Sequence, residues 1–116
     1  MEKLIGHNKI KTAVFISGAG SNLKNLIRFS VIKKSPISVN LIISNNKAQG
    51  LKFADQFKIK KKIFNFENLK DTEKKILSLV KKKKIKLICL AGFMKILSKY
   101  FIKNFEGKII NIHPSL

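Results

Sequence analysis

The sequence predicts an α/β protein with a Rossmann-like fold, a mostly parallel sheet that carries helices on both faces. Three observations support this prediction. Short, wholly apolar runs recur along the chain, as is typical of strands buried on both faces of a sheet. Segments of about 10–15 residues with helical spacing of apolar side chains alternate with these runs, which is the pattern of βαβ units. Glycine or polar residues end most of the runs, as expected where a strand turns into a helix.

The elements follow from these signals in chain order. Strands are expected at residues 12–16, 39–43, 62–64, 87–91 and 108–111. Helices are expected at residues 21–33 and 48–57, from Asp71 to the lysine run, and from a cap at Ser98 to Asn104.

Length and composition predict one modest domain. We interpret residues 1–10 as a polar leader and residues 11–116 as the domain. No apolar run approaches the roughly 18 residues that cross a bilayer. Cys89 stands alone among apolar neighbours, so it is expected in the core, in a protein of a reducing, cytoplasmic compartment. One Cys, two His and six acidic residues, none at ligand spacing, predict no metal site.

The formal net charge of +19 makes a nucleic-acid binder one interpretation. All but one of the 25 basic residues are Lys, however. Proteins that recognise specific nucleic-acid sequences rely instead on the bidentate contacts of Arg. Lys, Ile, Asn and Phe make up 61 of the 116 residues, as expected from an AT-rich genome. We therefore expect solvated lysines that attract anionic substrates and no specific nucleic-acid partner. The alternative, a lysine-driven binder, would show a steep salt dependence.

The first strand ends in a turn, residues 17–22, with the physical properties of a phosphate site. Gly18 and Gly20 let the backbone approach an anion, and the first N–H groups of the next helix point at it. Ser21 and Asn22 add side-chain donors. The turn has neither the third glycine of a dinucleotide fingerprint nor the Gly-Lys-Ser/Thr of a P-loop. Taken alone, it predicts either an anion site or a merely tight turn.

Residues 90–97 form a second candidate, at the end of the most apolar strand. Gly92 followed by large apolar side chains can wall a pocket for a flat aromatic ligand. The alternative is that Phe93, Met94 and Leu97 are ordinary core residues.

The last strand carries a polar pair. Asn111 and His113 lie two residues apart, and such residues share one face of a strand. Pro114 then ends the strand. An amide able to donate to an oxyanion and an imidazole able to move a proton would therefore project together, where open α/β sheets bind ligands. The alternative is a histidine that is satisfied near a strand end.

In this order, these segments resemble the phosphoribosylglycinamide formyltransferases, the folate-dependent enzymes of purine synthesis. The resemblance covers residue 11 to the last residue. It implies a Rossmann-like formyltransferase domain, 10-formyltetrahydrofolate as the co-substrate that donates the formyl group, and glycinamide ribonucleotide as the acceptor. The matching segments are ISGAGSNL at 16–23, SN at 44–45, LAGFMKIL at 90–97 and NIHPSL at 111–116.

The resemblance also implies roles for single residues. Gly20, Ser21 and Asn22 would bind the phosphate of the ribonucleotide. Asn111 and His113 would be catalytic: Asn111 would stabilise the tetrahedral oxyanion, and His113 would stabilise it and assist proton transfer. The folate pocket would be lined by Met94, Lys95, Ile96 and Leu97.

Two departures from the family pattern shape the expectation. Lys95 stands where the family often has Arg, and it gives up planar, bidentate hydrogen bonding. The family also continues beyond the HPSL segment, and its catalytic aspartate lies there, whereas Asp55 and Asp71 both precede the motif. We therefore expect a truncated, N-terminal portion of the formyltransferase domain, with little or no turnover by itself.

Other functions stay open at this point. Methionyl-tRNA formyltransferase and formyltetrahydrofolate hydrolase share the Asn-x-His chemistry but lack the Ser-Gly-x-Gly-Ser-Asn turn, which favours glycinamide ribonucleotide as acceptor. A non-catalytic remnant that binds a phosphorylated ligand is the alternative from a different class.

Overall fold

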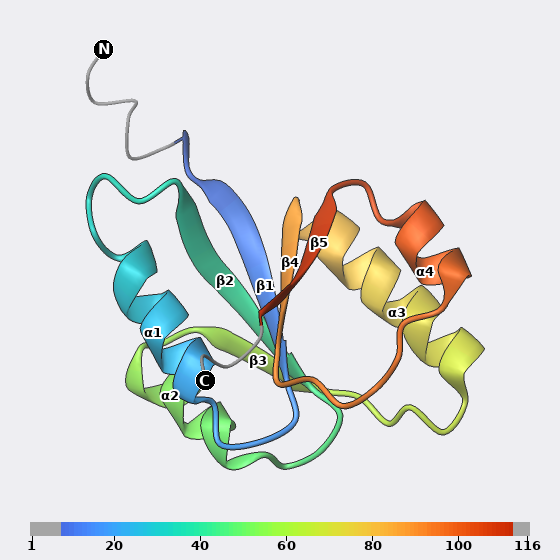
Figure 1. Ribbon diagram of the computed structural model, residues 1–116. Coiled ribbons are helices and arrows are strands. Elements are labelled where there is room, and N and C mark those ends of the chain that lie inside the picture. Colours follow the sequence, from blue (N-terminus) through green and yellow to red (C-terminus); the bar gives the residue numbers. More distant parts are fainter. Residues whose placement is uncertain (1–7, 113–116) are drawn as a thin grey trace.

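Five parallel strands form one sheet in the computed structural model, which describes residues 8–112. The chain builds from β1 outward to β2 and β3, and then returns to the other side of β1 with β4 and β5 (Figure 1). The strand order β3-β2-β1-β4-β5 therefore has its switch point between β1 and β4. The strands are β1 (Ile10–Ile16), β2 (Ile37–Ser44), β3 (Lys60–Ile63), β4 (Leu87–Ala91) and β5 (Lys108–Ile112).

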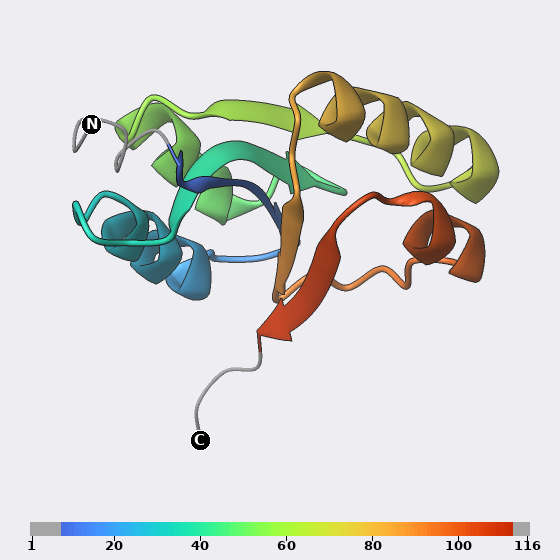
Figure 2. The same ribbon diagram turned by 90° about the horizontal axis from the view of Figure 1, so that it is seen from above.

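Helices cover both faces of this sheet. In Figures 1 and 2, α1 and α2 lie on one side of the strands, and α3 and α4 lie on the other. The predicted α/β, Rossmann-like architecture is confirmed. The helical segments are α1 (Ser21–Ser30), the 3₁₀ turn η2 (Gln49–Leu51), α2 (Lys52–Gln56), α3 (Leu69–Lys82) and α4 (Lys99–Asn104).

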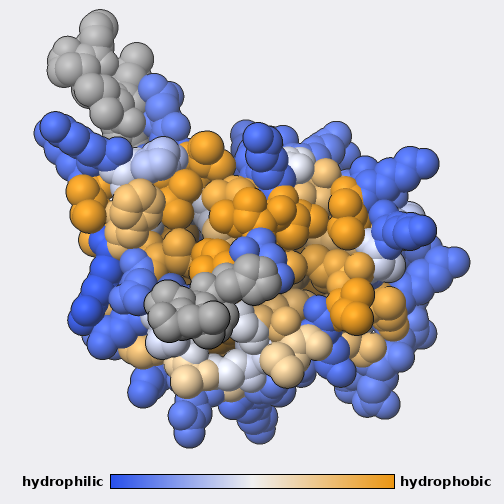
Figure 3. Space-filling model, in the orientation of Figure 1, coloured by the Kyte–Doolittle hydropathy of each residue, from blue (hydrophilic) through white to orange (hydrophobic). Residues whose placement is uncertain are grey.

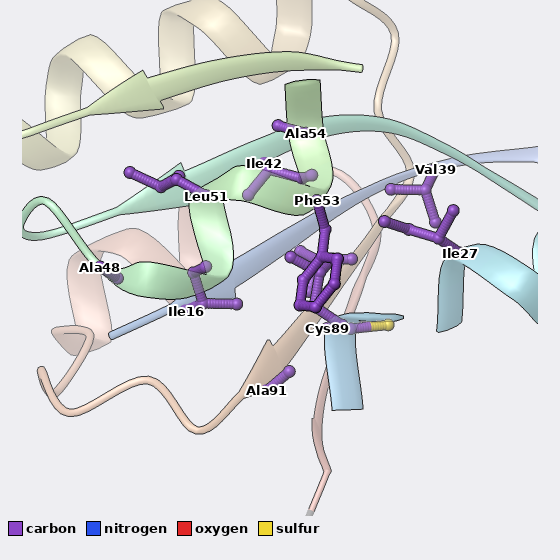
Figure 4. Close-up of a cluster of buried hydrophobic side chains, with 12 residues drawn as sticks. Ile16, Ile27, Val39, Ile42, Ala48, Leu51, Phe53, Ala54, Cys89 and Ala91 are labelled. Carbon is purple, nitrogen blue, oxygen red and sulfur yellow. The ribbon is translucent and has the colours of Figure 1, made fainter. Parts of the chain in front are cut away.

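The central strand shows why the apolar runs lack alternation. Val14 and Ile16 belong to the core cluster beneath α1 and α2, whereas Ala13 and Phe15 belong to the cluster beneath α3 and α4. All four side chains are fully buried, because a helix layer covers each face of β1. Cys89 on β4 is part of the first cluster, where Phe53 also inserts (Figure 4), so its prediction as a core residue is confirmed.

Most elements differ from their predicted bounds by one to three residues; α1, for example, ends at Ser30 and not at residue 33. β3 begins at Lys60, earlier than residue 62, and all of its residues are exposed, so no burial pattern marks it. The predicted helix at 48–57 is a 3₁₀ turn followed by the short α2. α3 begins at Leu69, because the side chain of Asn68 caps it by accepting a hydrogen bond from the Asp71 amide (3.2 Å).

β5 forms one edge of the sheet among the described residues. Ile110 on this strand is 44% exposed. Figure 3 shows apolar surface across the middle of the viewed face, with hydrophilic side chains around it.

Candidate functional site

The turn between β1 and α1 presents the first amide groups of α1 at the carboxyl edge of the sheet. Gly20 is the N-cap residue, in the left-handed conformation (φ 81°), and no side chain of the described residues caps the helix there. The first turn of α1 holds no acidic residue. Its N–H groups and the positive end of the helix dipole are thus available to an anion, without a competing carboxylate.

A close approach of two glycines holds this turn against η2. The Gly50 amide donates to the Gly18 carbonyl oxygen (2.9 Å). A Cβ atom on Gly20 would lie 2.8 Å from the Gly50 Cα atom, which is closer than real Cβ atoms come. Glycine is therefore required at position 20 for two reasons: the positive φ angle, and the close approach of Gly50, which leaves no room for a side chain.

Two lysines that belong to no sequence motif add positive charge beside Gly20. The Nζ atoms of Lys24 and Lys52 lie 5.6 and 5.3 Å from the centre of the Phe53 ring. The same ring would be 3.4 Å from a Cβ atom on Gly20. This grouping depends on how α2 packs against the turn, so no local pattern in a lysine-rich sequence could have indicated it.

The loop from Gly92 to Ser98 lies beside the turn, at the end of β4. Its Met94 amide donates to the Ser17 hydroxyl (2.8 Å). Phe93 anchors the loop through edge-to-face contacts with Phe15 and Phe66, with ring centres 5.3 and 5.5 Å apart. The switch point thus places the two predicted binding segments next to each other.

The four residues predicted to line the folate pocket fall into two groups. Met94 and Ile96 are 78% and 86% exposed, and Lys95 is exposed as well. Leu97 instead belongs to the core cluster beneath α3 and α4. Three of the four side chains are thus open to a ligand, while Leu97 offers a ligand mainly its backbone.

Asn111 lies on β5 opposite Leu90, close to the start of the Gly92–Ser98 loop, and is exposed. Ile109 packs against the cluster beneath α3 and α4, so Asn111, two residues further, projects on that same side of the sheet. His113 lies outside the described residues, and its role stays a prediction.

A hollow of about 490 Å³ lies elsewhere, at the opposite edge of the sheet, where Lys86 and Glu106 precede β4 and β5. Within residues 8–112, no three His, Cys, Asp or Glu side chains are grouped as a metal site would require. None of the helices in this range is both long and apolar enough to cross a bilayer.

Comparison with known proteins agrees with this geometry. The model of the formyl transferase family matches residues 10–116. The phosphoribosylglycinamide formyltransferase of Haemophilus influenzae is 41% identical over 110 residues, and the trifunctional purine biosynthetic protein adenosine-3 of Gallus gallus is 39% identical over 113 residues. The crystal structure of phosphoribosylglycinamide formyltransferase from Brucella melitensis superposes with a TM-score of 0.85 at 38% identity.

These matches cover nearly all of this chain but only part of each relative. They include 91% of the chain and 52% of the H. influenzae protein, and 94% of the chain and 11% of the G. gallus protein. The B. melitensis match includes 93% of the chain and 58% of the solved one. The chain spans about half the length of its single-function relatives.

Proposed function

Because the chain belongs to the formyl transferase family, we propose that it acts in the transfer of a formyl group from 10-formyltetrahydrofolate to the amine of glycinamide ribonucleotide, in purine synthesis. The observation that carries the choice of acceptor is the uncapped start of α1 behind Gly20, with Lys24 and Lys52 beside it. An acceptor that ends in a phosphate fits a helix terminus of this kind.

In the proposed arrangement, Gly20, Ser21 and Asn22 hold the phosphate and the Gly92–Ser98 loop holds the formyl donor. The exposed side chains of Met94, Lys95 and Ile96 supply apolar contact and one positive charge. Because the two loops adjoin at the switch point, the acceptor amine and the formyl carbon can be brought together between them.

The chemical step is an acyl transfer. The acceptor amine attacks the formyl carbon, and its electron pair forms the new C–N bond while the carbonyl oxygen becomes an oxyanion. Collapse of this intermediate breaks the bond to the folate nitrogen, which leaves with a proton. We assign stabilisation of the oxyanion to the Asn111 amide, and both stabilisation and proton transfer to His113. Asn111→Ala should slow any formyl transfer that the protein supports by about 10²–10³-fold.

The single buried thiol Cys89 fits a reducing compartment, so we place the protein in the cytoplasm.

Binding provides the decisive experiment, because it does not depend on turnover. We expect calorimetry to show that glycinamide ribonucleotide binds, and that inorganic phosphate competes. Replacing Ser21 and Asn22 together by Ala should weaken binding by about 10–100-fold, since hydrogen bonds to a charged group are lost. The matched control replaces Asn25, one helical turn further along α1, and Ser78 on α3 by Ala; both residues are exposed and lie outside residues 17–22.

Unchanged affinity in the Ser21 and Asn22 variant would remove these two side chains from the assigned site, and failure of inorganic phosphate to compete would overturn the site at the start of α1. Binding of the ribonucleotide without any binding of 10-formyltetrahydrofolate would instead favour a phosphate-binding protein that has no formyl transfer.

A further inference from the structure

The hydroxyl group of Ser17 lies where three loops of the carboxyl edge meet. Ser17 follows β1 directly, and its Oγ atom donates to Asn45 Oδ1 (2.5 Å), just after β2. The same Oγ atom accepts a hydrogen bond from the Met94 amide (2.8 Å), after β4. The Ser17 carbonyl oxygen also accepts a hydrogen bond from Asn46 Nδ2 (3.1 Å). One short side chain therefore links the ends of β1, β2 and β4, and these three strands are neighbours in the sheet (Figure 1).

The Asn45 contact gives this hydroxyl a defined direction. A hydroxyl group has one proton and two lone pairs. The Ser17 O–H group points at Asn45 Oδ1 and donates a hydrogen bond to it. A lone pair of the Ser17 oxygen therefore faces the Met94 amide and accepts its hydrogen bond. Asn45 thus orients the acceptor that holds the Gly92–Ser98 loop.

Two hydrogen-bonded ties hold the ends of the Gly92–Ser98 loop, beside the apolar contacts of Phe93 and Leu97, and the Ser17 hydroxyl is the first of them. The far end is held by the buried Glu73, whose carboxylate accepts the Ser98 amide (2.8 Å) and the Ser98 hydroxyl. Between these ties lie the exposed Lys95 and Ile96. Position and direction of this stretch therefore depend on where its two ends are held.

The neighbouring turn of residues 17–20 has its own supports. Gly18 O accepts the Gly50 amide, and Gly20 O accepts the Lys24 amide, both at 2.9 Å. Loss of the Ser17 hydroxyl would leave these two hydrogen bonds in place. Loss of the Ser17 hydroxyl should therefore displace the Gly92–Ser98 loop and leave the turn of residues 17–20 in place.

We propose that Ser17 is a positioning residue for the formyl donor: its hydroxyl holds the Met94 backbone so that residues 94–96 keep the geometry that binds the folate. This inference rests on the proposed function. It assigns Ser17 no contact with the reacting atoms. The proposal predicts different effects on the two ligands: the affinity for the formyl donor depends on the Ser17 hydroxyl, and the affinity for the ribonucleotide does not.

The test compares Ser17→Ala, Ser17→Thr and the exposed-site control Ser78→Ala. Amide hydrogen exchange, followed by NMR in the ligand-free protein, reports on the tie itself. The Met94 amide should exchange at least about tenfold faster in Ser17→Ala, while the Phe101 amide, held by Ser98 Oγ (3.2 Å), should be unchanged. Ser17→Thr keeps the hydroxyl and should restore slow exchange at Met94.

Ligand affinities complete the test. In Ser17→Ala, 10-formyltetrahydrofolate should bind about 3–10-fold more weakly, as expected for one lost neutral hydrogen bond. Glycinamide ribonucleotide should bind within about twofold of wild type, and Ser17→Thr should recover donor affinity. A purely structural role would lower both affinities together.

Each contrary result has a distinct meaning. Equal Met94 exchange in Ser17→Ala and wild type, or unchanged donor affinity, would overturn the positioning role. If the wild-type protein bound neither ligand, the proposed function would fall, and with it the assignment of Ser17 to a folate. The exchange data would still establish or refute the hold on the loop.

Discussion

Glu73 is a carboxylate buried in the core, only 1% exposed. Its two oxygen atoms accept hydrogen bonds from the Ser98 amide and hydroxyl, and Ser98 Oγ in turn accepts the Phe101 amide at the start of α4. Glu73→Gln should lower the free energy of unfolding by about 1–3 kcal/mol, because one carboxylate oxygen becomes an NH₂ group that cannot accept. Urea denaturation measures this loss.

The exposed Glu106 provides the matched control for that variant. Glu106→Gln should change the free energy of unfolding by no more than about 0.5 kcal/mol. Equal stability of the Glu73→Gln and Glu106→Gln proteins would show that the buried carboxylate does not hold α4.

Burial raises the pKa of the Cys89 thiol from an ordinary value of 9.0 to about 11. On unfolding, the thiol would ionise from about pH 9, while the folded thiol stays protonated up to about pH 11. The unfolded state therefore binds fewer protons in this window, and stability should fall as pH rises, by at most about 1.4 kcal/mol per pH unit. Urea denaturation between pH 8 and 11 measures this fall in the free energy of unfolding.

Cys89→Ala isolates the contribution of the thiol. Titrations common to both proteins cancel in the difference, so the stability advantage of wild type over Cys89→Ala should shrink above pH 9. A difference that stayed constant up to pH 11, or rapid labelling of the folded thiol at pH 8, would contradict burial of Cys89.

At the residue scale, the sequence predicts those features of the candidate site that depend on neighbouring residues in the chain. The glycine turn predicts the open start of α1, because φ and the helix terminus are local properties. The burial of Leu97 and the ring contacts of Lys24 and Lys52 depend on packing between distant elements, so the sequence did not reveal them. The Ser17–Met94 hydrogen bond spans 77 positions and is equally beyond local reasoning.

At the scale of elements, the contact between the β1–α1 turn and η2 can be tested through its glycines. A Cβ atom on Gly50 would lie 2.8 Å from Ile16 Cδ1 and 2.9 Å from Gly20 Cα, whereas one on Gly18 would meet nothing within 4 Å. Gly50→Ala should therefore cost about 1–3 kcal/mol of stability through overpacking. Thermal unfolding of both variants measures the contrast.

Gly18→Ala is the paired control, and its stability should equal or exceed that of wild type by up to about 1 kcal/mol, through the smaller entropy of the unfolded chain. If Gly50→Ala were as stable as Gly18→Ala, the close approach of the two segments would be wrong.

The bounds of a strand were predictable where an apolar run spans the whole strand, and they were missed where exposed residues belong to it, as at Ile10 and Lys11 in β1. β4 has the bounds expected from its apolar run, since both faces are covered. β3 consists of Lys60, Lys61, Lys62 and Ile63 at the other edge of the sheet, where lysines discourage pairing with further strands. Ile63 is its one apolar residue, so the sequence predicts a strand at residues 62–64, and the pairing with β2 shows that it begins at Lys60 and ends at Ile63.

For the whole molecule, alternation of strands and helices predicts a parallel sheet but leaves the strand order open. The order places β1 next to both β2 and β4, and this arrangement brings the turn of residues 17–20 beside the Gly92–Ser98 loop, where we propose the site. Local sequence patterns indicate the β1–α1 turn and the Gly92–Ser98 loop as separate segments. The crossover of the chain after β3 brings the two segments together. The family resemblance supplied this second step, which spacing alone could not.

The net charge of +19 acts on the whole molecule as self-repulsion. The Debye length falls from about 30 Å at 0.01 M salt to about 10 Å at 0.1 M, and the Cα radius of gyration, 13.9 Å, lies between these values. Added NaCl should therefore raise the unfolding midpoint over this range. NaCl is the appropriate salt, because sulfate stabilises proteins by exclusion and could also occupy the start of α1.

Lys70 and Lys74 lie four positions apart on the exposed side of α3, so they repel each other. Lys74→Glu replaces that repulsion with an attractive pair and lowers the net charge from +19 to +17. The variant should be more stable than wild type by about 0.5–1 kcal/mol at 0.01 M NaCl, and the advantage should shrink at 0.3 M as the charges are screened. Lys74→Gln, which removes the charge without reversing it, should lie between the two. A wild-type midpoint that fell with NaCl, or a Lys74→Glu advantage independent of salt, would show that charge repulsion does not limit the stability of this fold.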